Sequence, residues 1–326
     1  MHTTLCFGEA LIDFHAHSAA APGMPPVYVA HAGGAPANVS VALARLGSST
    51  SFIGMLGEDA FGKFLLDSLR EEGVDTRYVR TTKRANTALA FVSLDVHGER
   101  SFSFYRPPSA DLLFESADFQ EEAFLRAHLF HVCSNSLTEE GIAAATLEGM
   151  RRARAAGALV SFDMNLRPAL WHADTDPLPR LWSALHAADI VKLSQEEMDV
   201  LSAVEGDESS VCERLWSGHA QWLVVTDGGR PLRWHTRNGH GVMSPFDVPA
   251  VDATGAGDAF VGGLLHGIVD SGAVPSTLPD LTGDAGRRDA VLRFAAACGA
   301  IAVTRKGSFQ AMPGVDEVHA FLHARS

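Results

Sequence analysis

The sequence has no long uninterrupted run of apolar residues, although apolar residues make up 46% of its 326 positions. A membrane-spanning helix needs about 18 or more such residues in a row, and no segment approaches that length. The first residues, MHTTLCFGEALIDF, also lack the basic start and the small-residue cleavage site of a secretory signal. We therefore expect a cytoplasmic protein without a membrane partner.

Basic residues and cysteines are also scarce. Lys and Arg total 26 against 39 Asp and Glu, a net charge of −13. A nucleic-acid-binding protein needs a basic face to neutralise phosphates, so we expect no nucleic-acid partner. The four cysteines form no CxxC pair, which indicates buried free thiols rather than a disulfide framework or a zinc site. If this acidic protein handles an anion, it must provide positive potential locally.

Short apolar runs alternate with amphipathic segments over much of the chain, as in the predicted strand 159–163, helix 178–187 and strand 190–193. This alternation predicts an α/β fold in which helices cover both faces of a mainly parallel sheet. Strand-like segments at about 11–31 and 86–107 interrupt the pattern, the second pair with a predicted hairpin turn at 96–99. We place them in a small separate sheet that acts as a lid. The stretch 271–287, rich in Gly, Pro, Asp and Thr, predicts a surface loop.

The segment VDATGAGDAF at 251–260 carries the clearest chemistry. Gly255 and Gly257 directly precede an apolar helix predicted at 259–269. The start of such a helix offers unpaired N–H groups and a positive dipole end, which suit phosphoryl oxygens. Asp258 stands in the first turn, where its carboxylate could accept the proton of an attacking hydroxyl. The alternative is a simple helix cap. The sequence has no GxxxxGK[ST] loop, which argues against the P-loop class.

A second motif, HAGGAPAN, occupies residues 31–38. Gly33 and Gly34 make a permissive loop, and Pro36 suits the first turn of a helix. Asn38 then presents its amide beside bare backbone, an arrangement that suits a ligand with several hydroxyl groups. Here too, a helix cap is the alternative.

VDATGAGDAF resembles the C-terminal signature of the ribokinase/PfkB family of sugar kinases, and GGAPANVSVALARLG resembles the N-terminal one, about 220 residues away. The segments FGEALIDF, FIGMLGEDAFG, SFDMNLRPALW and LVVTDGG look like those of fructokinases within the family. The resemblance implies one ribokinase-like catalytic domain over residues 1–326. Its fold would be a three-layer α/β/α sandwich with a mainly parallel central sheet and a small β-sheet lid.

The resemblance also implies residue roles. Asp258 would be the catalytic base, and the backbone N–H groups of Gly255, Ala256 and Gly257 would form the anion hole. The positions that match sugar-binding ones are Asp13, Gly33, Gly34, Asn38, Arg106, Asn165 and Arg167. ATP would contact Thr226, Gly228 and Gly257. Glu197 would hold Mg²⁺ through water, and a K⁺ loop would contain Asp252, Thr254, Ala302, Arg305 and Gly307. Two departures from the family's motifs are Ser194, for the Asn of N-x-x-E, and Met164, for the Pro of D-P-N.

The expected reaction is the transfer of phosphate from ATP to D-fructose, giving fructose 6-phosphate and ADP. A 2-keto-3-deoxygluconate kinase is an alternative, because Arg106 and Arg167 could clamp the carboxylate of its substrate. An aminoimidazole riboside kinase is another alternative, since the segment HVCSNSLTEEG looks like the corresponding segment of those kinases. A non-catalytic sugar- or nucleotide-binding protein would be expected to lose Asp258 or the glycines. By resemblance we also expect a homodimer through the lid.

Overall fold

The structure of the chain is a computed structural model, which describes residues 3–17, 27–94 and 100–325. The predicted hairpin turn at 96–99 lies outside the described residues.

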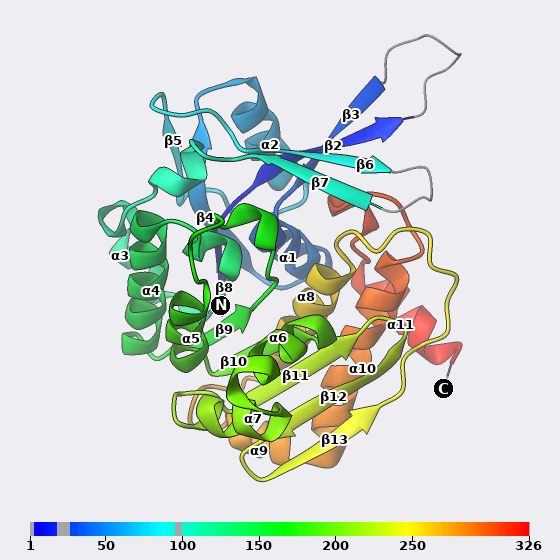
Figure 1. The fold of residues 1–326 in the computed structure, drawn as a ribbon. Coiled ribbons are helices and arrows are strands. Elements are labelled where there is room, and N and C mark those ends of the chain that lie inside the picture. Colours follow the sequence, from blue (N-terminus) through cyan, green and yellow to red (C-terminus); the bar gives the residue numbers. More distant parts are fainter. Residues whose placement is uncertain (1–2, 18–26, 95–99, 326) are drawn as a thin grey trace.

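A nine-stranded sheet forms the centre of the molecule, in the order β13-β12-β11-β10-β9-β8-β1-β4-β5 (Figure 1). From β11 to β5 all neighbouring strands are parallel, and β12 and β13 extend the sheet antiparallel at one edge. The strands are β1 (Thr3–Phe7), β4 (Thr50–Gly57), β5 (Val79–Thr82), β8 (Ala127–Cys133), β9 (Leu159–Asp163), β10 (Ile190–Ser194), β11 (Trp222–Asp227), β12 (Arg230–Thr236) and β13 (Gly239–Met243).

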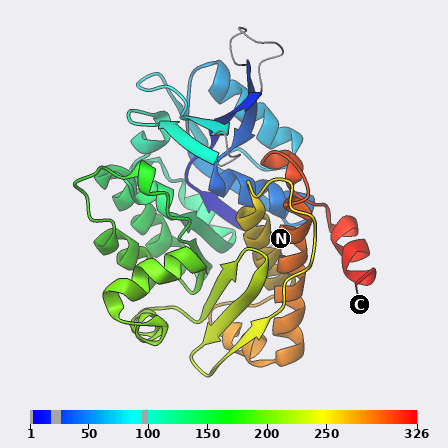
Figure 2. The same cartoon turned by 45° about the vertical axis from the view of Figure 1, so that its right-hand side comes forward.

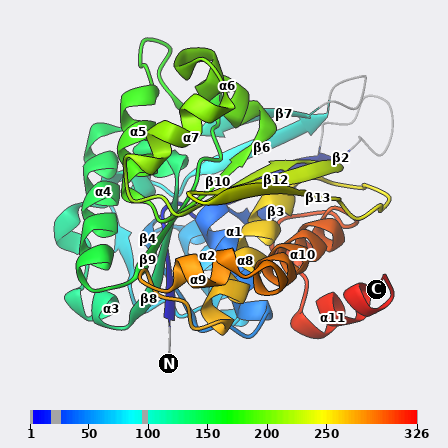
Figure 3. The same ribbon diagram turned by 90° about the horizontal axis from the view of Figure 1, so that it is seen from below.

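Helices cover both faces of this sheet (Figure 3). One side holds α1 (Ala35–Arg45), α2 (Ala60–Glu71), α8 (Ala256–Asp270), α9 (Leu278–Gly283), α10 (Ala285–Ala302) and α11 (Val315–His323). The other side holds α3 (Glu121–Leu125), α4 (Glu140–Ala155), α5 (Leu178–Ala187), α6 (Gln195–Glu205) and α7 (Glu208–Trp216). Strands covered on both faces are apolar almost throughout, and every residue of β4 is buried. Among the described helices, none is long and apolar enough to cross a membrane.

A second, four-stranded sheet stands above the main body, at the upper end of the molecule in Figures 1 and 2. Its order is β3-β2-β6-β7, and we call it the lid sheet. Its strands are β2 (Leu11–His17), β3 (Val27–Gly33), β6 (Leu89–Leu94) and β7 (Arg100–Tyr105). The predicted fold is therefore confirmed: a mainly parallel sheet between helical layers, with a small separate sheet.

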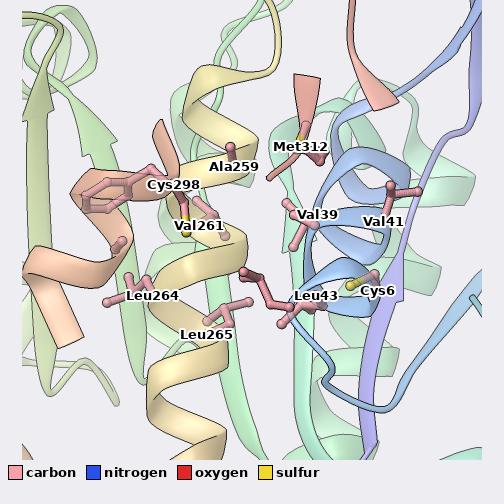
Figure 4. Close-up of a cluster of buried hydrophobic side chains, with 14 of the residues drawn as sticks. Cys6, Val39, Val41, Leu43, Ala259, Val261, Leu264, Leu265, Cys298 and Met312 are labelled. Carbon is pink, nitrogen blue, oxygen red and sulfur yellow. The ribbon is translucent and has the colours of Figure 1, made fainter. Parts of the chain in front are cut away.

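Helix α8 packs against α1, and this contact places the two sequence motifs side by side. Val39 and Leu43 of α1 face Val261 and Leu265 of α8 in the core (Figure 4). Gly262 lets the helices approach closely, because a Cβ at this position would collide with the Cβ of Ala42. The start of α8 is thereby fixed beside the first turn of α1.

The prediction of a surface loop at 271–287 is wrong in part. Helix α9 and the beginning of α10 occupy its second half. Leu278 and Leu281, three residues apart, are both buried in the core beneath the sheet. Burial of this short apolar face outweighs the loop-like composition, and Pro279 is tolerated because it lies in the first turn of α9.

Candidate active site

A cavity of about 460 Å³ lies between the lid sheet and the carboxyl ends of the central strands. Ligands of open parallel sheets bind at this edge, because the loops that follow adjacent strands converge there. The cavity wall comes from the ends of β1, β8, β9 and β10, the start of α8 and the lid strands. It is lined by Glu9, Leu11, Asp13, Gly34, Ala35, Asn38, Phe104, Asn135, Asp163, Asn165, Arg167, Lys192, Ser194, Glu196, Glu197, Ala253, Thr254, Gly255, Gly257, Asp258 and Ser308.

Asp258 and Asn38 meet in this wall. The Asn38 Nδ2 donates a hydrogen bond of 2.7 Å to the Asp258 Oδ2, and both side chains are buried. Burial raises the pKa of the Asp258 carboxyl, while the bond from Asn38 and the charges of Arg167 and Lys192 oppose the rise. Asp258 thus presents a carboxylate of increased basicity to the cavity. It sits in the first turn of α8, and its side chain is hydrogen-bonded to Asn38 of α1.

The start of α8 faces the cavity through glycine. Gly255 is the N-terminal cap and adopts a left-handed backbone, with φ of 73°, a conformation that glycine reaches without steric cost. Gly255 and Gly257 both line the cavity. The N–H of Ala256 donates to the Ala253 carbonyl at 3.2 Å, so this predicted anion-hole donor already has an acceptor within the protein.

Asp13 reaches the cavity from lid strand β2. Its Oδ2 accepts a hydrogen bond of 3.3 Å from the Ser308 hydroxyl. Burial raises the pKa of Asp13 to about 7, helped by the nearby Asp258 and Glu9 and opposed by the Ser308 bond. Gly33 lies against this carboxylate, because a Cβ at Gly33 would collide with it. Gly34 lines the cavity directly.

The loop after β9 contributes two of the predicted residues. Asn165 has a positive φ of 36°, a conformation that costs free energy in a non-glycine residue and concentrates at functional sites. Arg167 follows it in the cavity wall. Arg106, in contrast, is not among the lining residues. Its buried guanidinium is ion-paired with Asp111 at 2.6 Å.

The sequence analysis missed several lining residues, among them the charged Glu9, Asp163 and Lys192. Glu9 accepts hydrogen bonds from the Ala35 N–H at 3.2 Å and from the Asn135 Nδ2 at 2.9 Å, so it anchors the start of α1. Lys192 is ion-paired with Asp163 at 3.1 Å. The available signal was a charged residue directly after, or inside, an apolar strand, where an unpaired charge is costly.

Glu197 is fixed at the start of α6. Its two carboxylate oxygens accept hydrogen bonds from the N–H groups of Leu166, at 2.6 Å, and Ser194, at 2.7 Å. The neighbouring Glu196 also lines the cavity. The described residues contain no cluster of three or more His, Cys, Asp or Glu side chains able to hold a metal. The carboxylates of Glu196 and Glu197 alone suit an ion whose other ligands are mainly water and phosphate, as those of Mg²⁺ usually are.

The predicted cation loop is formed from two chain segments. The buried Asp252 carboxylate accepts from the Thr254 N–H at 2.7 Å and from the Gly307 N–H at 3.4 Å. Its oxygens therefore join the segments before α8 and after α10, and carboxylate oxygens are ligands that suit a hard cation. The Arg305 side chain pairs with Glu317, and the Ala302 carbonyl accepts from the Arg305 N–H.

Two of the predicted nucleotide residues, Thr226 and Gly228, lie at the end of β11 and just after it. The Thr226 hydroxyl donates to the Leu193 carbonyl at 3.4 Å, and Gly228 has a left-handed backbone with φ of 54°. Neither residue lines the main cavity, so their contact with a nucleotide stays a prediction.

Comparison with known proteins gives consistent matches. Residues 1–313 match the family model described as pfkB family carbohydrate kinase. Fructokinase-1 of Oryza sativa subsp. japonica is 43% identical over 313 residues, which cover 96% of this chain and 95% of the relative. The structure of a fructokinase with bound ATP from Xylella fastidiosa is 51% identical, with a TM-score of 0.95 over 99% of this chain and 98% of that one. A double mutant of the Vibrio cholerae O395 fructokinase, in a form with bound fructose, ADP and potassium ion, is 34% identical, with a TM-score of 0.82 over 99% and 98%.

Proposed function

We propose that this chain, which belongs to the pfkB family of carbohydrate kinases, is an ATP-dependent fructokinase. The observation that carries the proposal is the buried Asp258 carboxylate at the glycine-lined start of α8, hydrogen-bonded to Asn38 and open to the cavity. A base beside a phosphoryl-binding helix start is the arrangement that phosphoryl transfer to a hydroxyl requires.

In the proposed reaction, the sugar lies between the lid sheet and α8. Asp13 accepts hydrogen bonds from the hydroxyl groups of the sugar, and Asn38 donates to them. Gly34, Asn165 and Arg167 complete this side of the cavity. Asp258 takes the proton of the attacking hydroxyl as its oxygen bonds to the γ-phosphorus. The N–H groups of Gly255 and Gly257 stabilise the transferred phosphoryl oxygens, in a site where fixed dipoles are most effective.

Two metal ions belong to this proposal. Glu196 and Glu197 would hold the water shell of a Mg²⁺ ion, which neutralises phosphate charge when it is bound. The Asp252 loop would hold K⁺, consistent with the potassium ion in the Vibrio cholerae relative. Such an ion would order the segment that leads into Gly255 without touching the sugar.

The structure bears on the choice of sugar. The carboxylate of 2-keto-3-deoxygluconate would call for the two-arginine clamp of Arg106 and Arg167. Arg106 is paired with Asp111 behind the cavity wall, which leaves Arg167 alone. This geometry favours a neutral sugar, and the similarity to fructokinases indicates fructose.

The test is a coupled ADP-release assay with ATP, Mg²⁺ and K⁺ against fructose, 2-keto-3-deoxygluconate, ribose, adenosine and aminoimidazole riboside. We expect fructose to have a kcat/KM larger by several orders of magnitude. Preference for another sugar would refute fructose as the substrate while keeping the kinase. No turnover with any of them, while ATP still binds, would favour a non-catalytic sugar- or nucleotide-binding protein.

We further propose a homodimer through the lid sheet. Tyr105 is 67% exposed and Val27 55% exposed on its strands. Tyr28, Phe91 and Tyr105 form a row of ring contacts across β3, β6 and β7, with centroids 5.4 and 5.2 Å apart. Tyr28 and Tyr105, at the two ends of this row, are exposed, and exposed apolar side chains grouped in this way are typical of a surface that pairs with another protein surface.

A further inference from the structure

Lys192 is a charged residue of the cavity to which the proposed reaction gives no role. It lies on β10 between the buried apolar residues Val191 and Leu193, and its side chain is 9% exposed. Its Nζ is 3.1 Å from the Asp163 Oδ1, and the register of β9 and β10 pairs the two residues directly. A buried ion pair is costly to desolvate and is weak evidence for stability. Its position in the cavity wall therefore calls for another explanation.

The ammonium group points toward the start of α8. A Cβ added to Gly257 would lie 3.6 Å from the Lys192 Nζ, so the charge lies next to the backbone that would hold the phosphoryl group. Burial disfavours the charged ammonium, but the carboxylates of Asp163, Glu197 and Asp258 outweigh it and raise the pKa of Lys192. Lys192 is therefore a cation at neutral pH.

The charges that line the cavity show why a cation is needed there. Six carboxylates face the cavity, those of Glu9, Asp13, Asp163, Glu196, Glu197 and Asp258. Among the described lining residues, Lys192 and Arg167 are the cations. ATP brings further negative charge, and charges in a partly buried site interact far more strongly than in water. Lys192 is the one placed at the helix start, where its charge adds to that of the dipole.

We propose that the Lys192 ammonium contacts the phosphoryl group during its transfer and that Asp163 positions it. The inference rests on the proposed kinase function. As the sugar oxygen bonds to the γ-phosphorus, the bond from phosphorus to the β–γ bridging oxygen breaks, and ADP leaves with that electron pair. The hydroxyl proton passes to Asp258. Lys192 keeps its proton throughout and stabilises the negative charge on the phosphoryl oxygens.

The test removes the charge without leaving an unpaired one. Lys192→Met alone strands the buried Asp163 carboxylate and is expected to destabilise the fold. The informative variant is Lys192→Met/Asp163→Asn, with Asp163→Asn alone to measure the contribution of Asp163. Lys63→Met/Asp67→Asn is the matched control, because it removes the same pair of charges from the exposed surface of α2.

For Lys192→Met/Asp163→Asn we expect kcat with fructose to fall by about 10²- to 10³-fold, the usual cost of losing one transition-state donor. The loss should persist from pH 6 to pH 9.5, with dissociation constants for fructose and ADP changed by less than about threefold. The fall in kcat should be smaller for Asp163→Asn alone, because the Lys192 ammonium remains. The control should retain the wild-type kcat.

Three results would overturn the inference. If the double variant regains kcat to within about fivefold of wild type, Lys192 is only the structural partner of Asp163. If the loss disappears above pH 9, Lys192 acts by lowering the pKa of Asp258 rather than by touching the phosphoryl group. A wild-type chain that phosphorylates no sugar would instead refute the proposed function itself, and the inference with it.

Discussion

Replacing Asp13 with Asn should make the sugar-free protein more stable above neutral pH and less active. Burial raises the pKa of Asp13 from 3.8 to about 7. Because the folded pKa lies above the unfolded one, protonation of Asp13 stabilises the native state fully below about pH 4, and this contribution is lost as the pH rises toward 7. Above pH 7 the native state therefore carries the whole cost of a buried charge. About three pKa units at about 1.4 kcal/mol each give an upper limit of about 4 kcal/mol.

The assay is urea unfolding of wild type and Asp13→Asn, without sugar, at pH 8 and pH 5. We expect the variant to be more stable by about 2 to 4 kcal/mol at pH 8, and by less than half as much at pH 5, where wild-type Asp13 is already protonated in the native state. Asp67→Asn on the exposed face of α2 is the control and should stabilise at neither pH, because it removes a surface pair with Lys63. An equal difference in unfolding free energy between Asp13→Asn and wild type at both pH values, or no difference at pH 8, would refute the reasoning.

The other predictions concern pH, cation and assembly. Since Asp13 and Asp258 must be ionised to bind and deprotonate the sugar, kcat/KM should fall as the pH drops below about 7; a flat profile from pH 5 to 8 would contradict this. Replacing K⁺ with tetramethylammonium should lower kcat if the Asp252 loop binds the ion, and complete indifference would count against that site. Tyr105→Lys should shift the protein from dimer to monomer in light scattering, whereas a wild-type monomer would exclude the lid interface.

The sequence alone located the chemistry that is local in the chain. Gly255, Gly257 and Asp258 lie within four consecutive residues, so glycine before an apolar helix predicted both the helix start and the carboxylate beside it. The lid sheet was predictable for a similar reason, since its strand pairs interrupt the regular strand–helix alternation. The contact between Asn38 and Asp258 joins residues 220 positions apart, and only the packing of α8 on α1 brings them together.

The rest of the site depends on which strands are neighbours, and local patterns do not encode this. Lys192 faces Asp163 because β10 lies beside β9, and Glu9 meets Asn135 because β1 lies beside β8. Arg106 matched a sugar-lining position, but its guanidinium forms an ion pair with Asp111. In the case of α9, two buried leucines outweighed a loop-like composition. Residue type and spacing therefore showed which charged residues the chain carries, whereas only the fold showed which of them pair with one another.

The most direct test of the account is turnover of Asp258→Asn, which keeps the size of the side chain and an oxygen able to accept the Asn38 hydrogen bond. The measurement is kcat with fructose and ATP, alongside calorimetric binding of each ligand. Asp270→Asn, at the exposed far end of the same helix, is the control. We predict that Asp258→Asn lowers kcat by about 10²- to 10⁴-fold while both ligands still bind and the control stays active. Near-normal turnover of Asp258→Asn would contradict the central claim that this carboxylate is the base.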